Sequence, residues 1–225
     1  MNDQTRQFAN VFFAVAQLFT NSPVFPTLFG LPNVGDLSDT YVTAFIPAGL
    51  TFAVWGPIYL GITAYAVYQA LPGQREREIH RRVGPLALVA AVTNTLWTPL
   101  WLAQYVTASL VVIVVMLITL ASIFVILRDM RGQLTRADQW CVAIPFSGYF
   151  AWINIATAAN VTTMLMAWGW DGGGIPAPVY SAAVQLVAVA IASVMIIYSR
   201  GHAGTYAYTA VLVWAFVGVF LGNNA

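Results

Sequence analysis

The sequence predicts an all-α integral membrane protein. Hydrophobic residues make up 60% of the 225 positions, and charged residues make up only 8%. Such a chain cannot cover itself with a water-soluble surface. The apolar residues also gather in long segments, and a helix needs about 20 of them to cross a bilayer. We therefore expect a bundle of helices surrounded by lipid.

Seven apolar segments are long enough to cross a membrane, and we expect each of them to form one helix. The first segment contains Pro23 and Pro26, so we expect a kink there. The seven expected spans are residues 8–31, 48–71, 84–105, 107–127, 140–168, 177–198 and 204–222.

The nine basic residues predict how the chain is oriented. All nine are arginines, and with seven spans they all fall on one side, whereas the opposite segments carry only Asp36, Asp39 and Asp171. Basic residues favour the cytoplasmic side. We expect a multi-pass protein with a cytoplasmic amino terminus and an external carboxyl terminus, in a bacterial inner membrane. A role for the arginines in binding anionic lipid stays open.

Several classes of membrane protein are disfavoured by what the chain lacks. It has no lysine for a retinal Schiff base. Both histidines, His80 and His202, fall in expected cytoplasmic loops, away from any haem within the bundle. No charged residue lies inside an expected span, in contrast to most ion-driven transporters. We expect no catalytic residue set, no metal site and no nucleic-acid partner.

Aromatic and polar residues at helical spacing mark the second, third and fifth spans. Residues three or four apart share a helix face. From a rise of about 1.5 Å per residue, the three faces overlap in the outer half of the membrane. The residues on these faces are Trp55, Tyr59, Asn94, Trp97, Trp152, Ala156 and Asn160.

These faces admit two interpretations. The tryptophans can pack as core residues, and the asparagines can form interhelical hydrogen bonds worth about 1 kcal/mol each. Alternatively, the aromatic faces bind a flat apolar ligand, and the amides fix its orientation. Spacing alone does not decide between them.

The three segments together resemble the TspO/MBR family, the tryptophan-rich sensory proteins related to the mitochondrial translocator protein. The matching segments are PAGLTFAVWGPIYLG at 47–61, NTLWTPLW at 94–101 and WINIATAAN at 152–160. They occur in the family's order, in its second, third and fifth helices and with its spacing. The resemblance covers about residues 8–168.

The resemblance implies a five-helix ligand-binding unit at residues 1–170. Its ligand would be a tetrapyrrole such as protoporphyrin IX, another apolar pigment or a sterol-like molecule, with no cofactor required. The protein would then act as a sensor, regulator or carrier. The implied ligand-binding residues are Trp55, Tyr59, Asn94, Trp97, Trp152, Ala156 and Asn160, under a lid loop that holds Asp36, Asp39 and Pro47.

The chain also departs from the family pattern. VTTML at 161–165 stands where sterol-binding relatives carry aromatic and arginine residues, which argues against sterol recognition there. Two further helices, at residues 171–225, extend beyond the short family members. We expect them to lie outside the pocket and to pack, through small residues such as Gly218, on the five-helix unit or on another subunit.

Two other functions stay open. The protein could be a structural or assembly subunit, either as a homodimer or within a larger membrane complex. It could also be an enzyme that degrades porphyrins photo-oxidatively through Trp97 or Trp152. We favour a binding protein over an enzyme.

Overall fold

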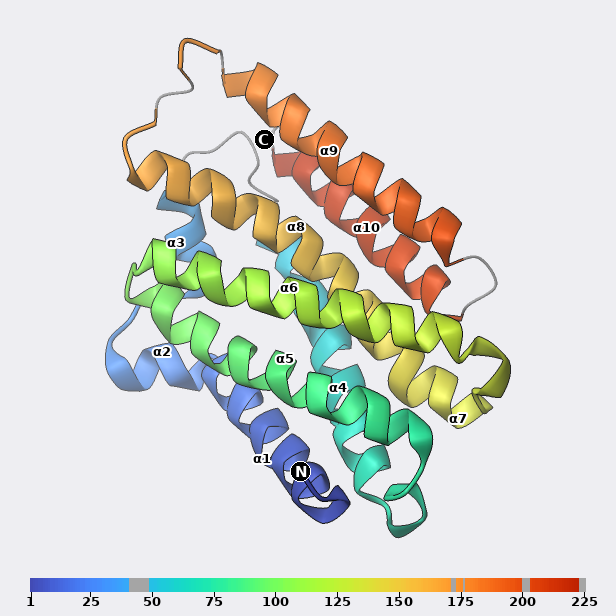
Figure 1. The fold of residues 1–225 in the computed structure, drawn as a ribbon. Coiled ribbons are helices and arrows are strands. Elements are labelled where there is room, and N and C mark those ends of the chain that lie inside the picture. The colour runs from blue at the N-terminus through green and yellow to red at the C-terminus, as the bar shows by residue number, and fades with distance from the viewer. Residues whose placement is uncertain (41–48, 171–172, 176, 200–202, 223–225) are drawn as a thin grey trace.

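The computed structural model describes residues 1–40, 49–170, 173–175, 177–199 and 203–222, and every regular element in this part of the chain is helical. The long helices lie side by side in one bundle, with α9 at its outer edge (Figure 1). The elements are α1 (Asp3–Thr20), α2 (Val24–Phe29), α3 (Val34–Thr40), η1 (Gly49–Val54), α4 (Trp55–Ala70), η2 (Pro72–Gln74), α5 (Glu78–Leu102), α6 (Val106–Asp129), η3 (Arg131–Gln133), α7 (Arg136–Asp138), η4 (Gln139–Ala143), α8 (Ile144–Ala167), α9 (Ala177–Tyr198) and α10 (Ala203–Gly222).

The first expected helix is broken rather than kinked. α1 ends at Thr20, where the backbone N–H of Asn21 bonds the carbonyls of Gln17 and Phe19. Pro23 follows, and because proline has no N–H it cannot continue the helical ladder. The chain then forms the short helix α2, which turns away from the axis of α1 (Figure 1).

Five helices among the described residues are long and apolar enough to cross a membrane. They comprise η1 with α4, α5, α6, α7 to α8, and α10. The expectation of seven spans is therefore not supported on length and composition. α1 falls outside this set, and α9 contributes only a shorter apolar stretch, Val189–Tyr198.

α1 has a low mean apolarity because one of its faces is polar. In contrast to a helix in water, the polar face is buried and the apolar face is exposed. Its outward face is apolar and exposed, with Phe8, Phe12, Val15 and Phe19. Its buried face is mostly polar, with Arg6, Gln7, Asn10, Gln17 and Thr20. This arrangement suits a lipid surround, in which polar side chains must find partners inside the protein.

α8 lies at the centre of the bundle and packs against α4, α6 and α10, while α5 lies between α1 and α6. α10 also packs on η1. A Cβ added at Gly218 would lie 2.0 Å from Thr51 Oγ1, so only glycine allows this approach. Trp214 Nε1 donates to the Thr51 carbonyl at 3.0 Å. The expected packing of the last helix on the five-helix unit is thus confirmed.

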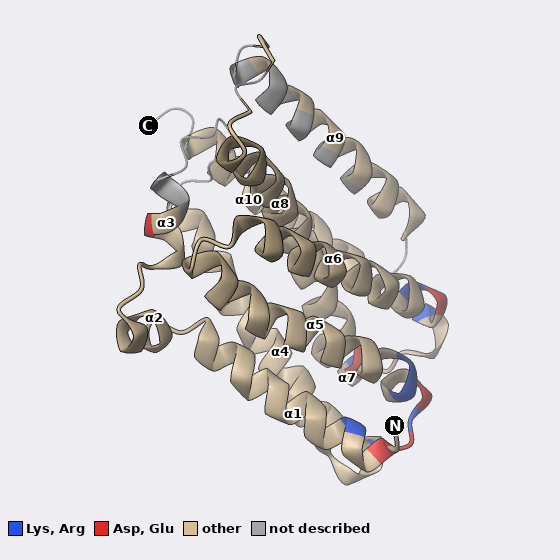
Figure 2. Cartoon of the chain, turned by 60° about the vertical axis from the view of Figure 1, so that its left-hand side comes forward, with Lys and Arg blue, Asp and Glu red and all other residues tan. Residues whose placement is uncertain are grey.

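The charged side chains of the described residues gather at one end of the bundle, apart from Asp36 near the other end (Figure 2). The best-connected pair there joins Arg77 to Asp138, with Nη2 and Oδ2 2.6 Å apart. Hydrogen bonding to Asp138 raises the pKa of the Arg77 guanidinium above its usual range. The opposite half of the bundle, which holds the candidate site, is nearly free of charge.

His80 is not in a loop, as the sequence suggested, but in the first turn of α5, where it is fully buried. Its Nε2 lies 3.1 Å from Gln74 Oε1, and its ring contacts Tyr68 edge-on. The sequence-based prediction for His80 was wrong because α5 begins six residues before the expected span. His202 lies outside the described residues.

Candidate functional site

A compact group of rings lies where α4 meets α8. Trp55 and Tyr59, one turn apart on α4, stack at a centroid distance of 5.0 Å and an interplanar angle of 10°. Trp152 of α8 meets Trp55 edge-on at 5.9 Å, and Tyr149 does so at 6.0 Å. Phe52 of η1 also meets Trp152 edge-on, at a centroid distance of 5.9 Å. We call these five residues the aromatic cluster.

Two polar atoms of the aromatic cluster are buried without a hydrogen-bond partner among the described residues. They are the hydroxyl of Tyr59 and Nε1 of Trp152. The Asn94 side chain lies close enough to the Tyr59 hydroxyl for a weak hydrogen-bonding interaction, but the two groups do not meet regular hydrogen-bond geometry. An unpaired buried polar group costs about 1–3 kcal/mol. A ligand that supplies the missing partners would remove this cost.

Asn94 lies in a second group of polar residues, which joins three helices. Its Nδ2 donates to the Tyr149 hydroxyl at 2.6 Å, and its Oδ1 accepts from Asn21 Nδ2 at 2.7 Å. Thr98 in turn donates to Asn21 Oδ1 at 2.7 Å. We call Asn21, Asn94, Thr98 and Tyr149 the Asn94 network. Both ends of the Asn94 amide are used, so in this structure Asn94 links α1, α5 and α8.

Asn160 joins α5, α6 and α8 in a similar way. Its Oδ1 accepts from Trp97 Nε1 and from Ser109 Oγ, both at 3.3 Å. Its Nδ2 donates to the Ala156 carbonyl at 3.1 Å. Trp97 also stacks on Trp101 at 5.6 Å. The polar groups of Trp97 and Asn160 are therefore satisfied within the protein.

The structure places the seven residues proposed from sequence in two sets, and both sets lie along one face of α8. Trp55 contacts both Tyr59 and Trp152, whereas Trp97 contacts Asn160 beside Ala156. Asn94 reaches the first set through Tyr149. Tyr149, Trp152, Ala156 and Asn160 follow one another at spacings of three and four, so one helix face carries all of them.

Sequence reasoning missed two residues that organise the site. Tyr149 contacts Trp55 and Asn94 at once. Its position three residues before Trp152 is the signal that could have found it. Asn21 gave no such signal. It reaches Asn94 because the end of α1 packs against α5, and this contact between helices cannot be seen in the sequence.

The expected lid region is partly helical. Asp36 lies in α3, where it is exposed and accepts from Asn33 Nδ2 at 3.1 Å. α3 packs against α5, and Leu37 is buried there. The side chain of Asp39 and all of Pro47 lie outside the described residues, so their expected role in a lid is not tested.

Comparison with known proteins identifies the family. A family model described as TSPO-like protein matches residues 7–225. The match runs past residue 168 through α9 and α10, so it extends over both helices that lie beyond the resemblance seen in the sequence. Searches of curated proteins and of solved structures gave no match. The chain therefore belongs to the TSPO-like protein family, as its resemblance to the TspO/MBR proteins led us to expect.

Proposed function

We propose that this TspO-type membrane protein binds a flat, largely apolar ligand of the tetrapyrrole class at the aromatic cluster, as a sensor, regulator or carrier. The observation that carries the proposal is the pair of unpaired polar atoms, the Tyr59 hydroxyl and Trp152 Nε1, among stacked rings. The rings offer faces for a planar molecule. The hydroxyl can donate or accept a hydrogen bond and the indole N–H can donate one, so the two could fix the ligand's orientation.

The accessibility of the cluster supports this assignment. Trp55 and Tyr59 are only half-buried, whereas Trp152 is 2% exposed. A ligand would therefore approach over α4 and meet the indole of Trp152 at the inner wall. η1, directly before Trp55, adds the ring of Phe52, which contacts Trp152.

We further propose that the cluster lies in the external half of the membrane, with the amino terminus in the cytoplasm. The charged end of the bundle, with its arginines, is then the cytoplasmic end (Figure 2). In this arrangement α1 also crosses the membrane, because its exposed face is apolar, and α9 completes seven spans. Cysteines introduced near Gln74 and near Gly173 should then be labelled from opposite sides.

Among the described residues, Asp36 is the charged side chain at the end of the bundle that holds the cluster, in contrast to the arginine-rich opposite end. A porphyrin carries carboxylates, and no described arginine lies at that end of the bundle. Protoporphyrin IX and its dimethyl ester should therefore bind with similar affinity, the ester at least as tightly. Binding that requires the free carboxylates would mean that the ligand sits at the arginine-rich end instead.

The experiment is a titration of detergent-solubilised protein with both porphyrins, followed by tryptophan quenching. Trp152→Phe should weaken binding about five-fold or more, since it replaces the indole with a smaller ring and removes the unpaired N–H donor. Trp140→Phe is the matched control, because Trp140 is exposed at the charged end. Absence of saturable binding in the wild type would refute the proposal, and so would equal affinity in both variants.

A further inference from the structure

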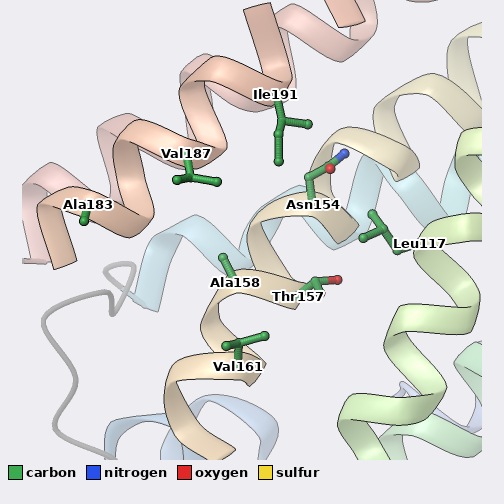
Figure 3. A pocket seen from close by; sticks show the side chains of 8 residues that line it. All are labelled: Leu117, Asn154, Thr157, Ala158, Val161, Ala183, Val187 and Ile191. Atoms are coloured by element: carbon green, nitrogen blue, oxygen red, sulfur yellow. The ribbon is translucent and has the colours of Figure 1, made fainter. Parts of the chain in front are cut away.

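A groove lies on the other face of α8, away from the aromatic cluster, between α6, α8 and α9 (Figure 3). Its volume is about 390 Å³, within the range of about 300–1,000 Å³ typical of small-molecule sites. Leu117 of α6 and Val187 and Ile191 of α9 face Ala158 and Val161 of α8 across it. The walls are therefore aliphatic.

Asn154 supplies the amide of this groove and projects from α8 into the space between α9 and α6 (Figure 3). Its Nδ2 donates to the Phe150 carbonyl at 2.8 Å and to the Tyr208 hydroxyl at 3.3 Å. Both N–H groups are thus used, and within the described part of the chain no donor reaches its Oδ1. The groove offers a hydrogen-bond acceptor in an apolar wall.

The chemistry of the lining limits what can bind. Among the described lining residues, Asn154 and Thr157 are the polar ones, and the Thr157 hydroxyl donates to the Ile153 carbonyl at 2.7 Å. None of these described residues is charged. A charged ligand would lose its hydration without compensation. The groove therefore selects a neutral molecule that can donate one hydrogen bond to Asn154.

The position of α9 leaves the groove open to molecules dissolved in the membrane. α9 is the outermost helix (Figures 1 and 2). The Arg128 guanidinium, 3.7 Å from the centre of the Tyr198 ring, holds its carboxyl-terminal end. Further along α9, Val187 and Ile191 remain 60% and 50% exposed. A ligand can therefore enter sideways from the lipid.

We propose that this groove binds a lipid-soluble alcohol, whose hydrocarbon part packs on the aliphatic walls and whose hydroxyl donates to Asn154 Oδ1. Asn154 lies about 15 Å along α8 from Ile144, deep in the membrane by a rise of about 1.5 Å per residue. A hydroxyl finds no water to bond at that depth. The side-chain carbonyl of Asn154 can accept its hydrogen bond instead. An ordinary lipid tail has no donor and would leave this carbonyl unpaired.

A second groove of the molecule provides an internal control. It lies between α1 and α4, has the same volume of about 390 Å³ and is lined by aliphatic residues such as Val15 and Val67. Its polar residue is Thr63, whose hydroxyl donates to the Tyr59 carbonyl at 2.8 Å. Because none of its lining residues carries a side-chain amide, this groove should take up hydrocarbon without preferring an alcohol.

The test is photolabelling of the full chain in lipid nanodiscs with diazirine-bearing hexadecanol, compared with its methyl ether. The ether keeps the shape but cannot donate a hydrogen bond. Peptides of α8 and α9 should be labelled about five-fold more by the alcohol, the ratio expected for one net hydrogen bond. Peptides of α1 and α4 should be labelled equally by both probes.

Three variants decide whether Asn154 is responsible. Asn154→Leu should abolish the preference for the alcohol, whereas Tyr208→Phe, which leaves the Asn154 carbonyl in place, should retain it. If Asn154→Leu does not fold, Ala158→Phe replaces it, and filling the groove should reduce labelling by both probes. Equal labelling of α8 and α9 by alcohol and ether in the wild type would overturn the proposal. A preference that persists in Asn154→Leu, or labelling unchanged in Ala158→Phe, would do so too.

Discussion

The aromatic cluster and the Asn94 network lie side by side and share the hydrogen-bonded Tyr149, yet two other polar atoms of the cluster differ from those of the network. In the network, both ends of the Asn94 amide bond other side chains. In the cluster, the Tyr59 hydroxyl and Trp152 Nε1 have no partner among the described residues. The satisfied groups of the network join helices, whereas the role that we propose for the unpaired atoms of the cluster is to bind a ligand.

The largest effect on stability is expected from Gly218→Leu, which tests whether the cluster depends on α10. Any side chain at this position meets Thr51, so η1 must shift together with Phe52. Such overpacking costs about 3 kcal/mol at the upper end of the usual range. The unfolding free energy should fall by that order, and porphyrin affinity should fall with it. Val217→Leu, at an exposed neighbour, should change neither.

Asn94→Leu should come next, with a loss of about 2 kcal/mol in unfolding free energy. It leaves the Asn21 amide and the Tyr149 hydroxyl each without one hydrogen-bond partner. Thr95→Val on the same helix is the control, because the Thr95 hydroxyl only bonds the Ala91 carbonyl of its own helix. If porphyrin affinity fell while the unfolding free energy stayed unchanged, the Asn94 network would belong to the ligand site and would not serve only to join helices.

Trp97→Phe should have the smallest effect on stability, about 0.5 kcal/mol, because it removes one long hydrogen bond to Asn160 and keeps the ring stacking on Trp101. Ser109 still donates to Asn160. Porphyrin affinity should be nearly unchanged, in contrast to Trp152→Phe. A loss of affinity as large as that of Trp152→Phe would place Trp97 in the binding site and enlarge the cluster.

Much of the fold could be predicted from the sequence, because apolar length alone locates the long helices. The break after Thr20 could not, since a proline within an apolar run is compatible with a kink or with an end. The start of α5 at Glu78 was missed because its first turns are charged and resemble a loop. The polar face of α1 was missed because a mean over the segment hides which side is buried.

The candidate site was predictable only as far as single helices allow. Spacing correctly places Trp55 on Tyr59, which are on the same helix. It cannot show that Asn94 is paired with Asn21 and Tyr149, because those contacts cross between helices. Whether an asparagine joins helices or is free to bind a ligand therefore depends on its hydrogen-bond partners. Those partners lie on other helices and cannot be read from a pattern within one segment.

Thermal unfolding of Tyr59→Phe shows whether the unpaired atoms of the cluster serve a ligand. This change removes one oxygen and leaves the ring stacked on Trp55. The ligand-free variant should unfold at the same temperature as the wild type or higher, because an unpaired hydroxyl is lost. The rise in unfolding temperature on adding protoporphyrin IX dimethyl ester should be smaller than in the wild type. A lower ligand-free unfolding temperature, together with an unchanged rise on adding the porphyrin, would show that the hydroxyl stabilises the fold and would contradict the account.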